Sequence, residues 1–409
     1  MYTYQDLVAV GESEQERIQF CLNVIDQHKN SDLYKIAYIA DQYDKQRNTT
    51  IVNFQKFLYT ISGKTVPDNW SANYKLASNF FHRFIIQQNQ FLLGNGIQWQ
   101  NDDTAKKLGD DFDIRLQNAG HAALSGALSF GFWNLDHMDV FKVLEFAPLW
   151  DEETGGLRAG VRWWQIDEKK PLRMTLYEED GYTEYRVYEG QSTVLKDKQK
   201  YKIKTATTAV DGTEIIGGEN YPSFPIVPFW GNPQHQSEIV GIREQIDAYD
   251  LIKSGFCNTI DEASMIYWTL ENAGGMDDTD LAKFLEQVKR LHATAMDDEV
   301  RVNSHSIEAP FTGRGDLLDR LRKDLYEDYM ALDTKEIASG AATATQIRAA
   351  YEPLNSKADS YEYCVHEFLQ GILAVAGIDD TATFTRSTMI NASEEITNVL
   401  QAAQYLSEE

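Results

Sequence analysis

The sequence predicts an α+β protein in which helices precede and follow an antiparallel β-meander. Three observations support this class. Apolar residues recur at helical spacing through most of residues 13–132, the period changes to two between Val140 and Phe229, and long helical seams follow. At 409 residues the chain can bury a sizeable core, and its length suggests two or three domains.

The composition is acidic, with a formal net charge of −25. Because binding to nucleic-acid phosphates depends on Lys and Arg, this balance argues against a protein that grips nucleic acid. Its ordinary interpretation is a soluble surface, and a sharper one is a surface past which a polyanion must move without sticking; composition does not separate the two.

The cysteines Cys21, Cys257 and Cys364 lie far apart, with no pairing or metal-ligand spacing, which is typical of a reducing compartment. The N-terminus has no signal-peptide pattern. No apolar run approaches the roughly 20 residues that span a bilayer, so we expect a soluble, cytoplasmic chain without a membrane partner.

The first third of the chain predicts mainly helices. Ser13 and Glu16 form a capping-box pattern at the start of one of them. A glycine signal at Gly94 ends another, and the last is rich in Ala and Gly and so able to pack closely. The predicted helices are Ser13–Asn30, Tyr34–Gln46, Asn73–Leu93 and Ile114–Phe132, with a short strand over Ile97–Gln100.

Glycine turns and a period of two predict the meander. Its expected strands are Val140–Ala147, Arg158–Ile166, Arg173–Tyr177, Thr183–Tyr188 and Lys200–Thr205. An aromatic cluster within it suggests a carbohydrate site, but alternating aromatics on a half-buried sheet more often serve packing, and we adopt that interpretation. The cluster comprises Trp150, Trp163, Trp164, Tyr177 and Tyr185.

Two helices beyond Phe229 carry narrow apolar seams that let helices pack along their length. The first seam includes Ile239, Ile242, Ile246 and Tyr249, and the second includes Leu318, Leu321, Leu325, Tyr329 and Leu332. Between them, strand-like Met265–Leu270, an amphipathic helix over Asp280–His292 and strand-like Val300–Ile307 predict a compact lobe.

A loop of small residues follows, over Asp333–Thr345, in which Lys335 is the sole positive charge. It leads into a long helix that ends at Gly377. Pro353 lies inside this helix and is expected to bend it, because proline removes one backbone hydrogen bond. A bent helix behind such a loop suits a part that must shift.

No chemical signature predicts catalysis, a cofactor or a metal. The sequence has no phosphate-binding loop and no nucleophile elbow. Asp136-His137-Met138-Asp139 is read as an ordinary turn rather than a metal site. The adjacent carboxylates Asp277-Asp278 and Asp297-Asp298 are read as solvated.

Four stretches carry a resemblance to a known family: the strand Phe224–Phe229, the helix Ile242–Asp250, the run Gly340–Ala344 and the late strand Thr383–Arg386. In this succession, over about residues 30–400, the chain resembles the portal proteins of tailed phages of the siphophage type. These are the head–tail connectors of double-stranded DNA phages and prophages. The family has no catalytic signature.

The resemblance implies a portal fold with these domains in chain order: a wing of helices and β-meander (1–235), a stem helix (236–260), a small α/β clip (261–310), a second stem helix (311–332), a tunnel loop (333–345), a long kinked helix with a return strand of the wing (346–391) and the start of a short or truncated crown (392–409).

The function that it implies is structural, without enzymatic activity. The chain would form a homo-oligomeric ring, a dodecamer, at one capsid vertex of the virion, through which double-stranded DNA is packaged and ejected. Its implied partners are the terminase, the head–tail adaptor, and the major capsid and scaffold proteins, with assembly in the cytoplasm of the bacterial host.

The resemblance also implies site residues. Those of the DNA channel are Lys335, Ser339, Thr343, Thr345 and Arg348, those of stem-helix packing are Ile239, Ile242, Ile246, Tyr249, Leu318, Leu321 and Leu325, and those of partner docking on the clip are Trp268, Asp277, Asp278 and Lys289. Lys253 is a further phosphate candidate. For Lys253 and Arg348, a salt bridge between subunits or along the helix is the competing interpretation.

Two alternatives stay open at this point. One is another virion or minor head structural protein built on the same helical hairpin. The other is a monomeric carbohydrate-active hydrolase that uses the Asp and Trp residues of the meander, which predicts a monomer with a concave aromatic pocket.

Overall fold

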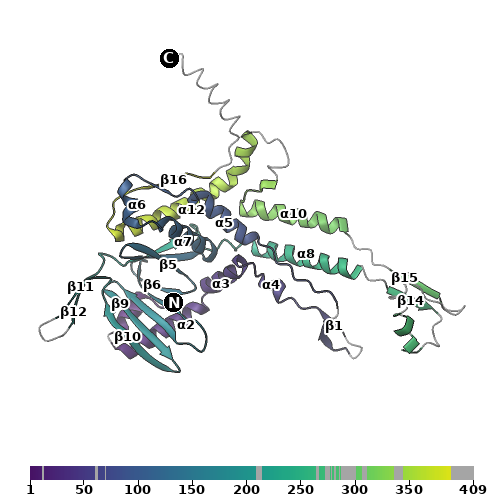
Figure 1. Cartoon of the computed structure of the whole chain (residues 1–409), viewed down its shortest axis with the longest axis horizontal. Helices are drawn as coiled ribbons and strands as arrows, with labels where there is room; N and C mark the ends of the chain where they lie inside the picture. The colour runs from purple at the N-terminus through teal and green to yellow at the C-terminus, as the bar shows by residue number, and fades with distance from the viewer. Residues whose placement is uncertain are drawn as a thin grey trace, which may run out of the picture. The chain divides into compact units, whose positions relative to one another are not determined.

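The structure, a computed structural model, describes residues 1–11, 13–59, 63–69, 71–208, 214–263, 267–271, 301–305, 311–335 and 344–387, with residues 277, 279–280, 282–284 and 286 between them. The chain divides into two compact units (Figure 1). The large unit comprises 1–49, 78–246 and 324 onward, and the small unit comprises 50–77 and 247–323. Of the described helices, none is long and apolar enough to cross a bilayer.

The large unit begins with three helices, α1 (Tyr4–Val10), α2 (Glu14–Asn30) and α3 (Asp32–Asp44). The second and third confirm the predicted helical stretches. The capping box expected at Ser13 does not form, since its side chain makes no cap hydrogen bond. It forms instead at Thr3 and Asp6, at the start of α1, which the sequence did not predict.

A five-stranded antiparallel sheet confirms the meander, with the strand order β10-β9-β8-β7-β6. Its strands are β6 (Phe146–Trp150), β7 (Leu157–Trp164), β8 (Leu172–Glu178), β9 (Gly181–Tyr188) and β10 (Gln191–Gln199). Each strand pairs with the next along the chain. β10 was not predicted, whereas the predicted strand Lys200–Thr205 corresponds to β11 (Lys202–Thr208), which pairs with β12 (Glu214–Glu219) in a separate hairpin.

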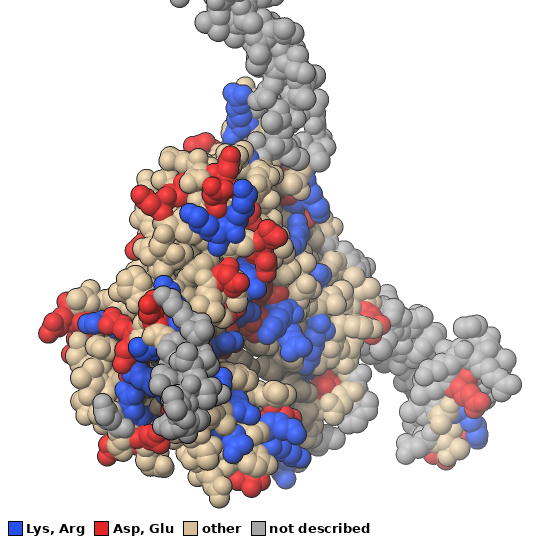
Figure 2. All heavy atoms as spheres, turned by 60° about the vertical axis from the view of Figure 1, so that its left-hand side comes forward, with Lys and Arg blue, Asp and Glu red and all other residues tan. Residues whose placement is uncertain are grey.

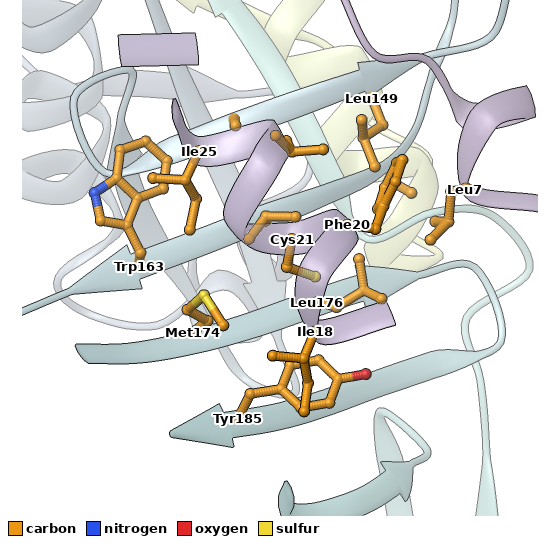
Figure 3. Close-up of a cluster of buried hydrophobic side chains, with 14 residues drawn as sticks. Leu7, Ile18, Phe20, Cys21, Ile25, Leu149, Trp163, Met174, Leu176 and Tyr185 are labelled. Atoms are coloured by element: carbon orange, nitrogen blue, oxygen red, sulfur yellow. The ribbon is translucent and has the colours of Figure 1, made fainter. Parts of the chain in front are cut away.

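The apolar face of α2 packs on this sheet (Figure 3). Ile18, Cys21 and Ile25 of the helix lie against Met174, Leu176 and Tyr185 of the strands, and all are almost fully buried. At the edge of this core, the Arg17 guanidinium donates to both carboxylate oxygens of Glu178, at 3.1 and 2.6 Å. The core therefore forms within one chain and needs no neighbour.

A second layer contains α5 (Phe80–Leu93), α6 (Asp102–Leu108) and α7 (Phe112–Gly126). The helix predicted from Asn73 starts only at Phe80. The backbone N–H groups of Tyr74 and Leu76 instead donate to Asn258 and Ser254, at 2.7 and 3.0 Å, and this pairing holds the segment before α5 out of a helix.

The helix predicted over Ile114–Phe132 ends at Gly126, because Ala127 adopts a left-handed conformation with φ 71°. The following residues form β4 (Leu128–Asn134), which lies between β5 (His137–Lys142) and β13 (Ile226–Trp230). The single strand predicted over Val140–Ala147 is likewise wrong, since a turn separates β5 from β6. Both errors arise where a buried apolar run has no clear period.

The small unit contains α4 (Thr49–Val52, at its border), the hairpin of β1 (Phe57–Tyr59) and β2 (Thr65–Pro67), and most of α8 (Arg243–Ala263) and α10 (Phe311–Tyr329). β14 (Tyr267–Glu271) and β15 (Arg301–His305) pair antiparallel, which confirms the two strands of the predicted lobe. Between them, the described residues from 279 to 286 are helical.

The long helix α12 (Ala344–Ala376) contains Pro353, as predicted. Figure 1 shows its first turns running in a different direction from the remainder. After α12, β16 (Ala382–Phe384) returns to pair with β3 (Ile97–Trp99). The predicted crown, residues 392–409, lies outside the described residues.

Candidate functional site

A polar network joins α5, the end of α10 and α12 inside the large unit. The Lys357 ammonium lies 2.6 Å from a carboxylate oxygen of Glu238, donates to the carbonyl of Tyr329 at 2.9 Å and sits 3.4 Å from the centroid of the Tyr329 ring. Burial lowers the pKa of Lys357, and the nearby Glu238 carboxylate opposes that shift. The pair is largely withdrawn from solvent, so each charge depends on the other.

Helix α5 supplies the remaining partners. The Tyr329 hydroxyl donates to Gln88 Oε1 at 2.7 Å, and the Tyr361 hydroxyl donates to Asn89 Oδ1 at 2.8 Å. Gln87 both donates to the carbonyl of Leu332 and accepts from its N–H, each at 3.0 Å. A pocket of about 410 Å³ opens onto this network, lined by Lys357, Glu238 and Gln88 among others. The middle of α12, beyond Pro353, is thereby anchored to the end of α10 and to α5.

The apolar seam between α8 and α10 is buried where the two helices belong to the large unit. Ile239, Ile242, Ile246 and Leu325 are each at most 3% exposed. Ile239 and Ile242 precede α8 rather than lying within it, because Gly241, at φ 95°, interrupts the helical backbone. Across the pair, the Gln245 amide donates to Asp328.

In the small unit the same two helices pack less completely. Tyr249, Leu318 and Leu321 are half-buried, and Leu251, Ile260 and Leu317 are 43–45% exposed. Arg314 of α10 donates to the Thr259 hydroxyl of α8 at 2.7 Å. In the described part of the small unit, these helices therefore carry apolar side chains that are only partly covered.

The β1–β2 hairpin is more exposed still. Phe57, Leu58 and Tyr59 are 57%, 39% and 83% exposed. Three consecutive large apolar residues on the surface of one hairpin are unusual for a protein that works as a single chain.

Of the predicted channel residues, the structure describes Lys335, Thr345 and Arg348, and all three side chains are exposed. Thr345 and Arg348 lie in the first turns of α12. Ser339 and Thr343 lie outside the described residues. Lys253, the other cationic candidate, places its ammonium 5.8 Å from the Tyr249 ring of the same helix.

Of the predicted docking residues, Trp268 lies in β14 opposite Ser304 of β15. Asp277 is exposed and accepts from the backbone N–H groups of Thr279 and Asp280, at 2.9 Å each, so that it caps the short helical stretch. Asp278 and Lys289 lie outside the described residues.

The packing interpretation of the meander aromatics is confirmed for Trp163, Tyr177 and Tyr185, which are buried. Trp150 stacks against Trp230 with ring centroids 6.3 Å apart, and Trp164 is 43% exposed. Opposite charges are interspersed over the face shown in Figure 2, although the whole chain carries a net charge of −25.

Sequence reasoning missed Lys357, Glu238, Gln88 and Asn89. A signal for the last two was present, since polar residues interrupt the apolar face of the helix that ends at Leu93. Nothing in the sequence pairs Lys357 with Glu238, because the two residues are far apart along the chain.

The described fold combines helices, an antiparallel meander and a pair of long helices, α8 and α10, whose seam is incompletely covered in the small unit. A family model for phage portal proteins of the SPP1 Gp6-like kind matches residues 22–409. The chain belongs to this family, which is structural and non-enzymatic.

Two relatives show how far the similarity extends. The portal protein of Clostridium phage phiCD119 is 27% identical over 207 residues, covering 48% of this chain and 46% of that protein. The portal protein of Bacillus phage SPP1 is 22% identical over 423 aligned positions, covering 92% of this chain and 78% of that protein. The match thus spans about half the length of the first relative.

Among solved structures, the chain is similar to a component of the neck of a native gene transfer agent particle computed with C12 symmetry. The TM-score is 0.48 at 9% identity, with 79% of this chain and 84% of that chain covered. A chain from the neck of the empty particle, computed with C6 symmetry, gives a TM-score of 0.46 at 9% identity, with 75% and 81% covered.

Proposed function

We propose that this chain assembles into a ring at a capsid vertex and forms the channel through which double-stranded DNA is packaged and later ejected. Its membership of the portal family supports this function. The observation that carries it is the exposure of large apolar side chains in the described part of the small unit, among them Phe57, Tyr59 and Leu317. Lateral contact with neighbouring copies would bury that surface, and each Å² of apolar area buried contributes about 25 cal/mol.

Oligomeric mass tests the ring directly. Native mass spectrometry and negative-stain images of the purified chain should show a closed assembly of about twelve copies with a central hole, the copy number that the resemblance implies. Monomeric protein that also failed to join rings at high concentration, or with capsid and scaffold proteins, would overturn the proposal.

Two variants test the surface that carries the proposal. Phe57→Asp and Leu317→Asp place a charge on the exposed apolar surface, so each should stay folded but lose the ring. Ile166→Asp is the matched control, since Ile166 is 89% exposed in the large unit and should leave assembly unchanged. Rings formed equally by all three variants would exclude a role for this surface.

Within the ring, we propose the loop 333–345 and the start of α12 as the part nearest the DNA. Lys335 and Arg348 would contact phosphates, and Ser339, Thr343 and Thr345 would line the passage. The sparse positive charge suits a channel through which a polyanion must slide. Capsids built with Lys335→Ala or Arg348→Ala rings should contain a different amount of nuclease-protected DNA from capsids built with the unmodified ring. Unchanged packaging would remove these residues from the channel.

For the lobe 261–310 we propose docking of the terminase during packaging and of the head–tail adaptor afterwards. Trp268, Asp277, Asp278 and Lys289 are the contact candidates. Trp268→Ala rings should bind purified terminase more weakly, whereas Asp167→Ala, an exposed change in the large unit, should not. Equal binding by both variants would exclude Trp268 from the contact.

A further inference from the structure

Three helices of the large unit bring two imidazoles and a carboxylate to one point. Asp44 is the last residue of α3, His82 lies in the first turn of α5 and His121 lies in α7. Each of these helices contacts the other two. His82 and His121 are 38 and 77 residues from Asp44 along the chain, so no spacing in the sequence reveals the cluster.

The contacts are short and converge on one carboxylate. His82 Nδ1 lies 2.9 Å from Asp44 Oδ1, and His121 Nε2 lies 2.9 Å from Asp44 Oδ2. One ligand atom from each residue falls within 4.8 Å of the others.

We propose that Asp44, His82 and His121 bind one divalent transition-metal ion, of which Zn²⁺ is the best fit. Zn–N and Zn–O bonds of about 2.0–2.2 Å place neighbouring ligand atoms about 3.3 Å apart, so small side-chain rotations complete the site. Two imidazoles select against Ca²⁺ and Mg²⁺, which prefer oxygen ligands. The side chains are 18–33% exposed, which leaves room for a water as the fourth ligand.

His137 provides the contrast. Its Nδ1 lies 2.8 Å from Asp136 and its Nε2 lies 3.5 Å from Asp139, so the two carboxylates face different edges of one ring. One ion cannot bind both nitrogens of a single imidazole. Within the described ranges, Asp44, His82 and His121 form the one cluster with metal-ligand geometry.

The ion would join α3, α5 and α7 at a single point. Helix α5 also carries Gln88 and Asn89, which hold α10 and α12. The ion would therefore connect α10 and α12, through α5, to the N-terminal helix α3. An ion that binds only the folded chain raises its melting temperature by mass action.

The test uses untagged, full-length protein stripped of metal and then titrated with Co²⁺, whose visible absorption reports four-coordinate binding, and with Zn²⁺ as competitor. One ion should bind per chain and raise the Tm. His82→Gln and His121→Gln should each weaken binding more than about tenfold and abolish the Tm shift. His137→Gln should bind like the unmodified chain.

Absence of saturable one-to-one binding, or unchanged binding by the His82→Gln and His121→Gln chains, would overturn the site. If either variant fails to fold, X-ray absorption of the zinc-loaded unmodified chain decides. Two imidazole nitrogens at about 2.0–2.1 Å support the proposal, and fewer than two overturn it.

Discussion

The large and small units differ in how far their large apolar side chains are buried. In the large unit, Phe84, Phe130, Tyr185 and Phe368 are among the most buried residues. In the small unit, Phe57 and Tyr59 are exposed, whereas Asp250, Ser254 and Asn258 are at most 5% exposed. The difference teaches that the large unit holds an extensive core of its own, whereas the described part of the small unit leaves large apolar side chains exposed.

The largest effect is expected in the large unit, from Lys357→Met. The change leaves Glu238 buried without its cation, and the free energy of unfolding should fall by about 3–5 kcal/mol in urea denaturation. Lys45→Met is the control, because Lys45 pairs with Asp41 on the surface and its loss should cost less than about 1 kcal/mol. Equal losses would mean that the buried pair contributes no more than an exposed one.

Leu176→Ala removes a fully buried side chain beneath α2 and should cost about 2–5 kcal/mol through lost burial and the cavity left behind. The matched change in the small unit, Leu58→Ala, removes a 39% exposed side chain and should cost the monomer about 0.5 kcal/mol or less. Thermal denaturation of the two monomeric variants compares them, and a cost for Leu58→Ala as large as that for Leu176→Ala would erase the contrast between the units.

Gly120→Ala tests the close packing of α7. A Cβ there would lie 2.0 Å from the Tyr361 hydroxyl and 2.6 Å from Asn89 Oδ1, so the hydrogen bond between those groups must shift. We expect a loss of about 1–3 kcal/mol from overpacking. Gly313→Ala, in α10, meets nothing within 4 Å and should not destabilise the chain, so destabilisation by both changes would point to a general glycine effect.

The smallest perturbation is alkylation of the cysteines. Burial raises the pKa of the Cys21 thiol to about 12, and Cys21 is fully buried, so it should resist iodoacetamide at pH 8. Cys257, half-buried on α8, should react in the monomer and more slowly in the ring. Mass spectrometry of the labelled peptides measures both, and equal Cys257 rates in monomer and ring would place α8 away from subunit contacts.

The sequence predicted the elements that depend on local periodicity. α2, the strands β7, β8 and β9 of the meander and the strands of the 261–310 lobe were readable from the sequence pattern. The start of α5 could not be predicted, because the backbone before it donates hydrogen bonds to the side chains of Asn258 and Ser254, which lie far away along the chain. The Lys357–Glu238 pair and the Asp44–His82–His121 cluster were hidden for the same reason.

The pairing of β3 with β16 has a consequence for synthesis. Thr383 of β16 donates to the carbonyl of Gln98 in β3, a residue 285 positions earlier in the chain. At about 5–20 residues per second, a ribosome needs about 15–60 s to add the intervening residues. During that time β3 has no β16 with which to pair. The fold of the large unit is therefore completed only after the residues of the small unit have been synthesised.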